Sequence, residues 1–285
     1  MEEISVYEQI SKKYYELSAA EKKIGDYVLS HQGKTQLMSI SELAEASDVS
    51  EATVTRFCRK LGCGSYNEFR LEVAKHAAAR GRVTNPLSGE VYETDSFSEV
   101  CSKLYNANVS AMTQTLELVK PEQYIKAADL IEAAKKVVCM GQGGSMIIAE
   151  ECAHLFSTTG SKFSAIADSH YQIVTAATMD EGDVILFFSY SGATKDMMDT
   201  LRVAGKRGGK VILVTRFPNS PGAKYADVIL QCGADESPLQ LGSIGARIAQ
   251  LYLMDILFSE VCRRNLDKCR ERRSMIADAL TEKHL

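Results

Sequence analysis

The chain lacks any apolar run close to the roughly 18 residues that a bilayer-spanning helix needs. Its first residues, MEEISVYEQISKKYYELS, also lack the basic-then-apolar order of a signal peptide. Both absences argue against a membrane protein and an exported one. The sequence therefore predicts a cytoplasmic protein with no membrane partner.

Paired cysteine motifs are also missing. The chain has 8 cysteines, but none forms a C-x-x-C pair and no histidine stands at zinc-finger spacing from them. These absences argue against a disulfide framework and against a bound metal. We expect reduced thiols that lie mostly in the core, and no metal site.

An excess of positive charge is missing as well. The chain carries 33 Lys and Arg against 37 Asp and Glu, a formal net charge of −4. Such a chain has no overall attraction for nucleic acid, so any DNA binding must come from a local basic patch.

The chain is nevertheless long enough for two domains. Its 285 residues are 45% hydrophobic, which allows roughly two domains of ~150 residues with sizeable cores. Residues 1–80 read as helices only, 80–100 collect Gly, Pro, Asn, Ser and Thr as a linker does, and apolar runs alternate with helical stretches from about 121. We predict an N-terminal domain at 1–78, a linker with connecting helices at 79–127, an α/β domain at 128–268 and a C-terminal helix at 269–285.

Two short helices joined by a turn are predicted within the N-terminal part. The first spans about Ile40–Ala46, with Ser41 before Glu42 as its cap. Ser50 caps the second, whose apolar stripe ends at Gly62 and consists of Val54, Phe57, Cys58 and Leu61. A capped helix, a turn and another capped helix are typical of a helix-turn-helix domain.

The second helix of a helix-turn-helix enters the major groove with its N-terminal residues at the base edges. Its candidate DNA contacts are Ser50, Glu51, Ala52, Thr53, Thr55, Arg56, Arg59 and Lys60. Around them, residues 52–82 carry a local positive surplus that suits phosphate contact. Its cations are Arg56, Arg59, Lys60, Arg70, Lys75, Arg80 and Arg82, against Glu68 and Glu72.

Five apolar runs alternate with helical stretches in the C-terminal part, which predicts βαβ units and a mostly parallel five-stranded sheet between helices. The predicted strands are Val137–Met140, Phe163–Ala167, Val184–Phe188, Val211–Val214 and Val228–Leu230. We expect one helix before them over Val100–Val119. The closing segment from Gly245 to Leu280 reads as helical throughout.

The stretch ILFFSYSGATKD runs from a buried strand straight into hydroxyls and a glycine. Ser189, Ser191 and Thr194 fall where that strand turns into a helix, the position at which open α/β sheets bind ligands. Unpaired N–H groups at a helix N-terminus attract anions. Such a turn suits a phosphate monoester, which carries about −1.5 to −2 charges at pH 7.

A second turn of this kind, CMGQGGSMIIAEE, places Gly141, Gly143, Gly144 and Ser145 at a comparable point. Met146 replaces the last glycine of the G-x-G-x-x-G dinucleotide pattern, and G-x-x-x-x-G-K-[ST] is absent from the chain. We therefore expect no nucleotide cofactor. Serine and glycine also end strands for structural reasons alone, but two hydroxyl-lined turns in one sheet favour a ligand site.

These turns resemble the SIS (sugar isomerase) domain, whose pattern includes G-x-G-x-S, here Gly141 to Ser145, and S-x-S-G-x-T, here Ser189 to Thr194. Together with ISELAEASDVSEATVTRFCRKLG, they make the chain similar to an RpiR/MurR-type transcriptional regulator over about 1–78 and 128–268. SPGAKYADVIL and GSIGARIAQLYLMDILF resemble late segments of these regulators, although Pro221-Gly222 replaces a more usual apolar pair.

The resemblance implies a regulator of carbohydrate metabolism genes whose operator binding is modulated by a phosphosugar. Its implied ligand contacts are Gly143, Gly144, Ser145, Ser189, Tyr190, Ser191, Gly192 and Thr194, with weaker candidates at Gln142, Asp168, His170 and Glu236. Together with the apolar IAQLYLMDILF, it suggests a homodimer or tetramer on a palindromic operator.

An enzyme is the alternative, since SIS folds also isomerise or cleave phosphosugars. Such a reaction needs a base near the sugar carbons, and Glu150 and His154 lie one helical turn apart after Ser145. Glu–His pairs at this spacing are common surface contacts, and an isomerase has no use for the N-terminal module. We expect a non-enzyme without catalytic residues and keep a phosphosugar isomerase or lyase as the alternative.

Overall fold

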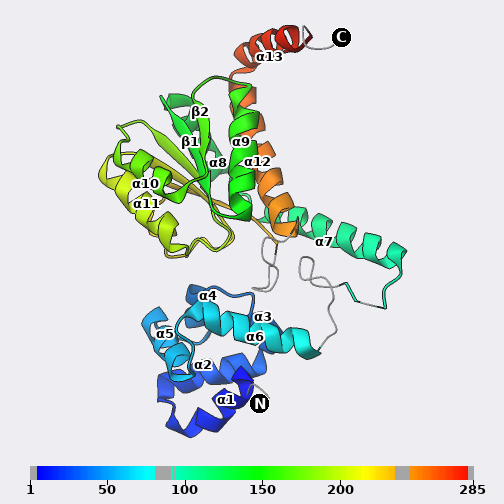
Figure 1. Cartoon of the computed structure of the whole chain (residues 1–285), viewed down its shortest axis with the longest axis vertical. Helices are drawn as coiled ribbons and strands as arrows, with labels where there is room; N and C mark the ends of the chain where they lie inside the picture. The colour runs from blue at the N-terminus through cyan, green and yellow to red at the C-terminus, as the bar shows by residue number, and fades with distance from the viewer. Residues whose placement is uncertain (1–4, 81–90, 93, 235–243, 282–285) are drawn as a thin grey trace. The chain divides into compact units, whose positions relative to one another are not determined.

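The computed structural model describes residues 5–80, 91–92, 94–234 and 244–281. The chain divides into two compact units, residues 1–107 with 235–245 and residues 108–234 with 246–285 (Figure 1). The domain boundaries at 78 and 128 stay a prediction.

The first unit is helical over 5–80, as predicted. Its elements are α1 (Val6–Lys13), the 3-10 turn η1 (Tyr14–Glu16), α2 (Ala19–Ser30), α3 (Gln32–Thr35), α4 (Ile40–Ala46), α5 (Glu51–Lys60) and α6 (Tyr66–Arg80). Residues from α1, α2, α4, α5 and α6 share one core, in which Ile10, Ile24, Leu43, Phe57 and Phe69 are fully buried. The amphipathic stripes read from the sequence therefore meet in a single helical core.

Helix α4 has the predicted bounds but a different cap. The Ser39 hydroxyl accepts from the Glu42 N–H at 3.2 Å, and the Glu42 carboxylate accepts from the Ser39 N–H at 2.8 Å, which makes a capping box. The expected cap at Ser41 is wrong, because Ser41 already lies inside the helix and its hydroxyl donates to Glu51. Only Ser39 has the extended backbone that a cap requires.

Helix α5 follows the prediction closely. The Ser50 hydroxyl accepts from the Thr53 N–H at 3.3 Å, and the whole predicted stripe from Val54 to Leu61 is buried. Gly62 ends the helix with φ +92°, a conformation that glycine adopts without a Cβ penalty. Helices α4 and α5 and the turn between them form the expected helix-turn-helix.

The second unit is built on five strands, each within one residue of its predicted ends. They are β1 (Val137–Gly141), β2 (Phe163–Ile166), β3 (Val184–Phe188), β4 (Lys210–Thr215) and β5 (Val228–Gln231). All pairings are parallel, in the order β2-β1-β3-β4-β5. The sheet is thus wholly rather than mostly parallel.

Helices cover both faces of this sheet (Figure 1). They are α8 (Pro121–Ala133), α9 (Gly144–Ser157), α10 (Ser169–Ala177), α11 (Lys195–Lys206) and α12 (Ile244–Arg264). Helix α13 (Leu266–Thr281) follows α12 and extends away from the sheet (Figure 1). On β3, Leu186 and Phe188 belong to the core that contains α8, α9 and α12 residues, whereas Ile185 and Phe187 belong to the core with α10 and α11 residues. Burial on both faces explains why this strand reads as an unbroken apolar run.

The strand order fixes where a ligand site can form. In the order 2-1-3-4-5, the chain reverses direction across the sheet between β1 and β3, and such a switch point opens a crevice at the carboxyl ends of the strands. Gly141 at the end of β1 lies opposite Phe188 at the end of β3. The turns that follow these two residues are therefore neighbours.

Two helices differ from the prediction at their ends. Helix α7 (Phe97–Glu117) begins three residues before Val100, because Ser96 and Glu99 form a reciprocal cap through the two backbone N–H groups. The closing helix breaks at Asn265 into α12 and α13. There the Asn265 amide donates to the Glu132 carboxylate at 2.7 Å.

The cysteines are all free, and six of the eight are buried, as expected. Burial raises the pKa of the Cys58 thiol to about 12, so this thiol stays protonated near neutral pH. Within the described ranges no helix is both long enough and apolar enough to cross a bilayer.

Candidate functional site

The turn after β3 is shaped by its own hydroxyls. The Ser189 hydroxyl accepts from the Gly192 N–H at 3.2 Å, and the Ser191 hydroxyl accepts from the Ala193 N–H at 3.3 Å. Ser189 is buried, and its N–H continues the sheet by donating to the Val214 carbonyl. Neither hydroxyl donates to a residue that the structure describes, so both O–H groups are available to a ligand.

Gly192 cannot be replaced without moving the neighbouring loop. Its φ is +58°, and a Cβ there would lie 2.1 Å from the Ser220 Oγ atom and 3.0 Å from the Thr215 Oγ1 atom. The Gly222 N–H donates to the Gly192 carbonyl at 2.8 Å, and a Cβ on Gly222 would lie 2.4 Å from the Met197 Cε atom. This close approach of two loops explains the glycine at position 222.

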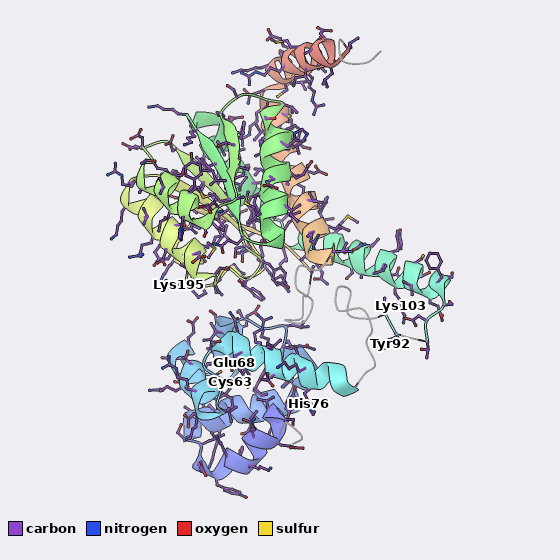
Figure 2. All side chains as sticks on the ribbon, in the orientation of Figure 1. Cys63, Glu68, His76, Tyr92, Lys103 and Lys195 are labelled. Atoms are coloured by element: carbon purple, nitrogen blue, oxygen red, sulfur yellow. The ribbon has the colours of Figure 1, made fainter. Side chains whose placement is uncertain are left out.

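The N-terminus of α11 is open. Thr194 occupies the N-cap position, but its exposed hydroxyl makes no capping hydrogen bond. The next N–H groups, those of residues 195–197, donate to no group in the described chain, whereas the Met198 N–H donates to Thr194. Figure 2 shows Lys195 at the start of this helix. Its side chain is 86% exposed, and its ammonium lies 3.2 Å from the Asp199 carboxylate. Three backbone donors at the switch point thus lack a partner.

The turn after β1 also leads into an uncapped helix. Gly143, with φ +55°, is the N-cap of α9 and has no side chain that could cap it. A Cβ on Gly141 would lie 2.7 Å from the Ser145 carbonyl oxygen, so this glycine lets α9 start directly against the strand. The Ser145 hydroxyl makes no hydrogen bond with the described residues.

Two glutamines stand beside these turns. The amide nitrogen and oxygen of Gln142 are buried and lack hydrogen-bond partners in the described chain, which is unusual for a buried polar group. Fully buried Gln172 on α10 donates to the Gly141 carbonyl at 2.9 Å and to the Ile166 carbonyl at 2.8 Å. Gln172 therefore ties the ends of β1 and β2 together. Sequence reasoning missed it because no local motif marks it.

The weaker sugar candidates have different surroundings. The Asp168 carboxylate caps α10 by accepting from the Tyr171 N–H at 2.7 Å, which assigns it a structural role. His170 is exposed in the first turn of the same helix, and Glu236 lies outside the described residues. Glu150 and His154 are both exposed on α9.

Tyr190 links the site to more distant elements. Its hydroxyl donates to the Ala234 carbonyl at 2.9 Å, and the Ala234 N–H donates to the Gln114 side chain at 3.1 Å. The Gly233 N–H donates to the Thr115 hydroxyl at 2.9 Å. The Tyr190 side chain is thus connected through the loop after β5 to α7. Because its hydroxyl already donates to Ala234, it has no further proton to donate to a ligand.

The predicted DNA contacts divide into two groups. Glu51, Ala52, Arg56 and Arg59 are exposed on α5, and Thr55 is half-buried. Thr53, by contrast, is 7% exposed, and its hydroxyl accepts from the Arg56 guanidinium at 3.1 Å. Its contacts are those of a residue that orients Arg56.

The basic surplus around α5 is smaller at the surface than the sequence indicates. The Lys60 ammonium donates to the Glu21 carboxylate at 3.2 Å and to the Glu16 carbonyl, so it holds the domain together. Arg70 is 8% exposed and donates twice to the Gln36 carbonyl. The prediction that it belongs to the basic surface patch is therefore wrong. The Arg80 side chain and Arg82 lie outside the described residues.

The described residues contain no group of three or more His, Cys, Asp or Glu side chains arranged to hold a metal ion. The site therefore consists of backbone N–H groups, hydroxyls and an unpartnered amide at the carboxyl edge of a parallel sheet.

Comparisons with known proteins agree with this architecture. The model of the helix-turn-helix domain of the rpiR family matches residues 4–80, and the SIS domain model matches residues 130–260. A solved structure, the NanR protein of Vibrio vulnificus complexed with ManNAc-6P, is 22% identical and covers 99% of this chain and 100% of its own, with a TM-score of 0.87. That similarity shows a shared fold.

Sequence relatives extend the match. Over 254 residues the chain is 33% identical to the bifunctional protein glk of Paraburkholderia xenovorans, covering 89% of this chain and 39% of that protein. It is 32% identical over 261 residues to an HTH-type transcriptional regulator of Caldanaerobacter subterraneus subsp. tengcongensis, covering 92% of this chain and 90% of the relative. The chain belongs to the rpiR family of transcriptional regulators, with an N-terminal helix-turn-helix and a C-terminal SIS domain.

Proposed function

We propose that this protein regulates carbohydrate metabolism genes, and that its binding to operator DNA changes when a phosphosugar occupies the turns after β1 and β3. The observation that carries the proposal is the open N-terminus of α11, beside the N-terminus of α9, which has no side-chain cap, at the switch point of the sheet. Two dipole ends and three unpartnered N–H groups make this place favourable for a dianion.

The phosphate lies on α11 in this proposal. The N–H groups of 195–197 and the hydroxyls of Ser189, Ser191 and Thr194 supply its donors, and Gly192 keeps Cβ atoms out of the way. ManNAc-6P in the NanR complex, a structure with the same fold, supports a phosphosugar as the ligand class. The sugar ring then lies toward β1, with Gly143, Gly144 and Ser145 close to it.

Gln142 is the residue that we expect to contact the sugar hydroxyls. Its buried amide offers one donor group and one acceptor, which matches a hydroxyl in either role. Exposed His170 lies at the same edge of the sheet, and we keep it as a second contact.

DNA binding belongs to α5. We propose that Glu51, Ala52, Thr55, Arg56 and Arg59 face the major groove. Ser50, Thr53 and Lys60 act indirectly, through the cap and the contacts described above. A two-fold operator needs two such helices, so we propose a homodimer or tetramer on palindromic DNA, in the cytoplasm where that DNA lies.

Catalysis is not part of the proposal. Glu150 and His154, the one candidate pair for a base, are exposed on α9 beyond its first turn. A regulator needs the ligand to remain bound and unchanged, and the helix-turn-helix unit gives that binding an output.

The test uses purified full-length protein and fragmented genomic DNA, with and without a panel of phosphosugars. We expect a few palindromic sites to be retained and one sugar to alter their retention. Thr194→Glu, which places a carboxylate at the open end of α11, should abolish the response. Thr194→Gln, which has the size of Glu without its charge, should keep a response that is weakened by loss of the hydroxyl. An equal response in both variants would contradict the phosphate site.

Control assays use the same proteins. Conversion of any panel sugar by the wild type, lost in Glu150→Gln or His154→Gln, would favour the isomerase or lyase instead. Retention of no specific DNA fragment would contradict the regulator proposal as a whole.

A further inference from the structure

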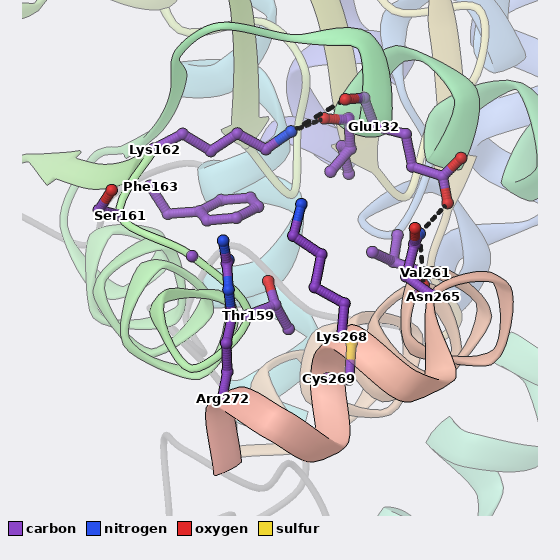
Figure 3. Close-up of a pocket in the computed structure, with 12 residues that line it drawn as sticks. Glu132, Thr159, Ser161, Lys162, Phe163, Val261, Asn265, Lys268, Cys269 and Arg272 are labelled. Carbon is purple, nitrogen blue, oxygen red and sulfur yellow. Dashed lines mark hydrogen bonds between the residues drawn. The ribbon is translucent and has the colours of Figure 1, made fainter. Parts of the chain in front are cut away.

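A second pocket lies at the opposite edge of the same sheet (Figure 3). Its volume is about 220 Å³, and it is bounded by the end of α8, the turn into β2, the end of α12 and the start of α13. The Lys162 carbonyl accepts from the Val137 N–H at the start of β1. The pocket therefore lies at the amino ends of strands whose carboxyl ends carry the candidate phosphosugar turns.

Three cations line this pocket, namely Lys162, Lys268 and Arg272. Of the described lining residues, Glu132 alone is acidic, and its carboxylate is engaged elsewhere. One oxygen accepts from the Asn265 amide at 2.7 Å, and the other lies 3.8 Å from Arg264, which does not line the pocket. The pocket thus holds more positive charge than its walls neutralise.

Lys162 is a fixed member of the cluster. Its ammonium donates to the carbonyls of Ile131, Glu132 and Ala134 at the C-terminal end of α8. A cation is favourable there because the last carbonyls of a helix carry partial negative charge. Burial lowers the pKa of Lys162, and the charge of Lys268 lowers it further. The charge of Glu132 acts in the opposite direction but does not outweigh these two causes.

Lys268 and Arg272 are free. Neither side chain makes a hydrogen bond or an ion pair with any residue that the structure describes, and Figure 3 shows both extending from α13 toward Phe163. Arg272 lies directly over Gly160, where a Cβ would be 2.2 Å from its Nη1 atom. A glycine at this turn allows the guanidinium to approach the backbone so closely.

The remaining walls are suited to a small organic anion. Ser161 offers an exposed hydroxyl that makes no hydrogen bond with the described residues, and Phe163 with buried Val261 supplies apolar surface. A guanidinium binds phosphate through two parallel N–H groups, and lysine adds a point charge. A volume below the usual range of about 300 to 1,000 Å³ for ligand pockets favours a compact ligand.

We propose that this pocket is a second anion site, which binds the phosphate group of a small metabolite through Arg272, Lys268 and Ser161. The bound phosphate would connect α13 to the turn before β2. Without it, Lys268 and Arg272 form no hydrogen bond or ion pair with the described residues of that turn. This inference does not depend on the phosphosugar assignment, because it uses other residues at the other edge of the sheet.

Hydrogen–deuterium exchange on the full chain tests the proposal, with inorganic phosphate added at constant ionic strength and chloride as the reference. We expect slower exchange in peptides covering 158–163 and 265–273. A second arm uses glycerol 3-phosphate. Stronger protection by this ester identifies an esterified ligand, and equal protection identifies the phosphate group alone as the recognised chemistry.

Matched variants on α13 locate the site. Arg272→Gln and Lys268→Gln should each raise the half-saturating phosphate concentration by about tenfold or more, as loss of a charged hydrogen bond predicts. Arg270→Gln removes the same charge from the same helix but outside the pocket, and it should behave like the wild type. Lys268 is exposed and makes no hydrogen bond or ion pair with the described residues, so its substitution leaves folding intact.

Three results would overturn the proposal: unchanged protection in both pocket variants, an equal loss in Arg270→Gln, or protection that follows protein concentration instead of phosphate. The last would assign the pocket to an interface between copies. Peptides covering 189–197 report on the phosphosugar turns in the same experiment, so failure at one site is distinguishable from failure at the other.

Discussion

Helices α2, α4 and α5 of the first unit have side-chain caps at their amino ends, whereas α9 and α11 of the second unit have none. Reciprocal capping boxes, Ser18 with Glu21 and Ser39 with Glu42, satisfy the first N–H groups of α2 and α4. Gly143 and Thr194 provide no such bond to α9 and α11. Helix α8 is also uncapped, but it begins with Pro121, which has no N–H to satisfy.

This difference separates structural helix ends from ends suited to a ligand. A buried or packed helix end without a cap costs stability, so a sequence with several serine caps could have closed α11 in the same way. Both ends without a side-chain cap fall at the switch point of the sheet. The missing caps are therefore as informative about function as the residues that are present.

The largest effect is expected at the turn that holds the open end of α11. Gly192→Ala should destabilise the second unit by about 2 to 4 kcal/mol, because it adds left-handed backbone strain and a clash with Ser220. Gly182 has φ +93° and open space around it, so Gly182→Ala should cost only about 1 kcal/mol. Urea unfolding of both variants measures the difference, and equal losses would mean that the Ser220 loop yields freely.

The second largest effect concerns α5, whose amino end is closed by Ser50. A capped end has few N–H groups left for DNA phosphate, so side chains must supply that contact. Arg59→Gln should weaken operator binding about tenfold and lower the salt dependence by about one counterion. Lys12→Gln removes an exposed charge from α1 and is the control. Fluorescence anisotropy at several salt concentrations would show an unchanged slope if Arg59 does not contact phosphate.

The third prediction compares the two kinds of helix end directly. Ser39→Ala should lower the stability of the first unit by about 1 kcal/mol, because it removes a capping hydrogen bond. Thr194→Ala should leave stability nearly unchanged, since its hydroxyl caps nothing, yet weaken phosphosugar binding. Thermal unfolding and titration calorimetry measure the two quantities. Destabilisation by Thr194→Ala would remove the distinction.

The smallest effect is a pH dependence at the α2 cap. Burial alone would raise the pKa of Glu21, but its hydrogen bonds with the Ser18 N–H and with Lys60 outweigh burial and hold that pKa below 4.5. The ionised carboxylate therefore stabilises the first unit above pH 4.5, and this contribution is lost as the pH falls below that value. Between about pH 6 and about pH 3, the melting temperature should fall less for Glu21→Gln than for the wild type. An equal fall in both proteins would rule out this role.

Local patterns predicted the local structure well. The α5 stripe, its Ser50 cap and the five strands each depend on residues close together in the chain, and all have the expected positions. The cap of α4 was misplaced by two residues, because Ser39 and Ser41 both stand near Glu42 and only the backbone angles distinguish them. The glycine and serine turns were located correctly because their residues are adjacent in the chain.

Features made by distant residues could not be predicted. Arg70 looks like a surface charge in the sequence, but α6 packs it against the Gln36 carbonyl. Gln172 reaches two strand ends, and Ser220 limits the space at Gly192 from another loop. Because such roles come from tertiary contacts, the pattern of neighbouring residues carries no sign of them.

The hydrogen bond from Tyr190 to Ala234 has a mechanical consequence. Ala234, with φ +73°, belongs to the segment anchored to Gln114 and Thr115 on α7. Helix α7 is continuous over 21 residues, and Gln114 and Thr115 lie in its last turns, within the second unit. A displacement of the Tyr190 side chain must therefore either break this hydrogen bond or move the loop after β5, which is bonded to the end of α7.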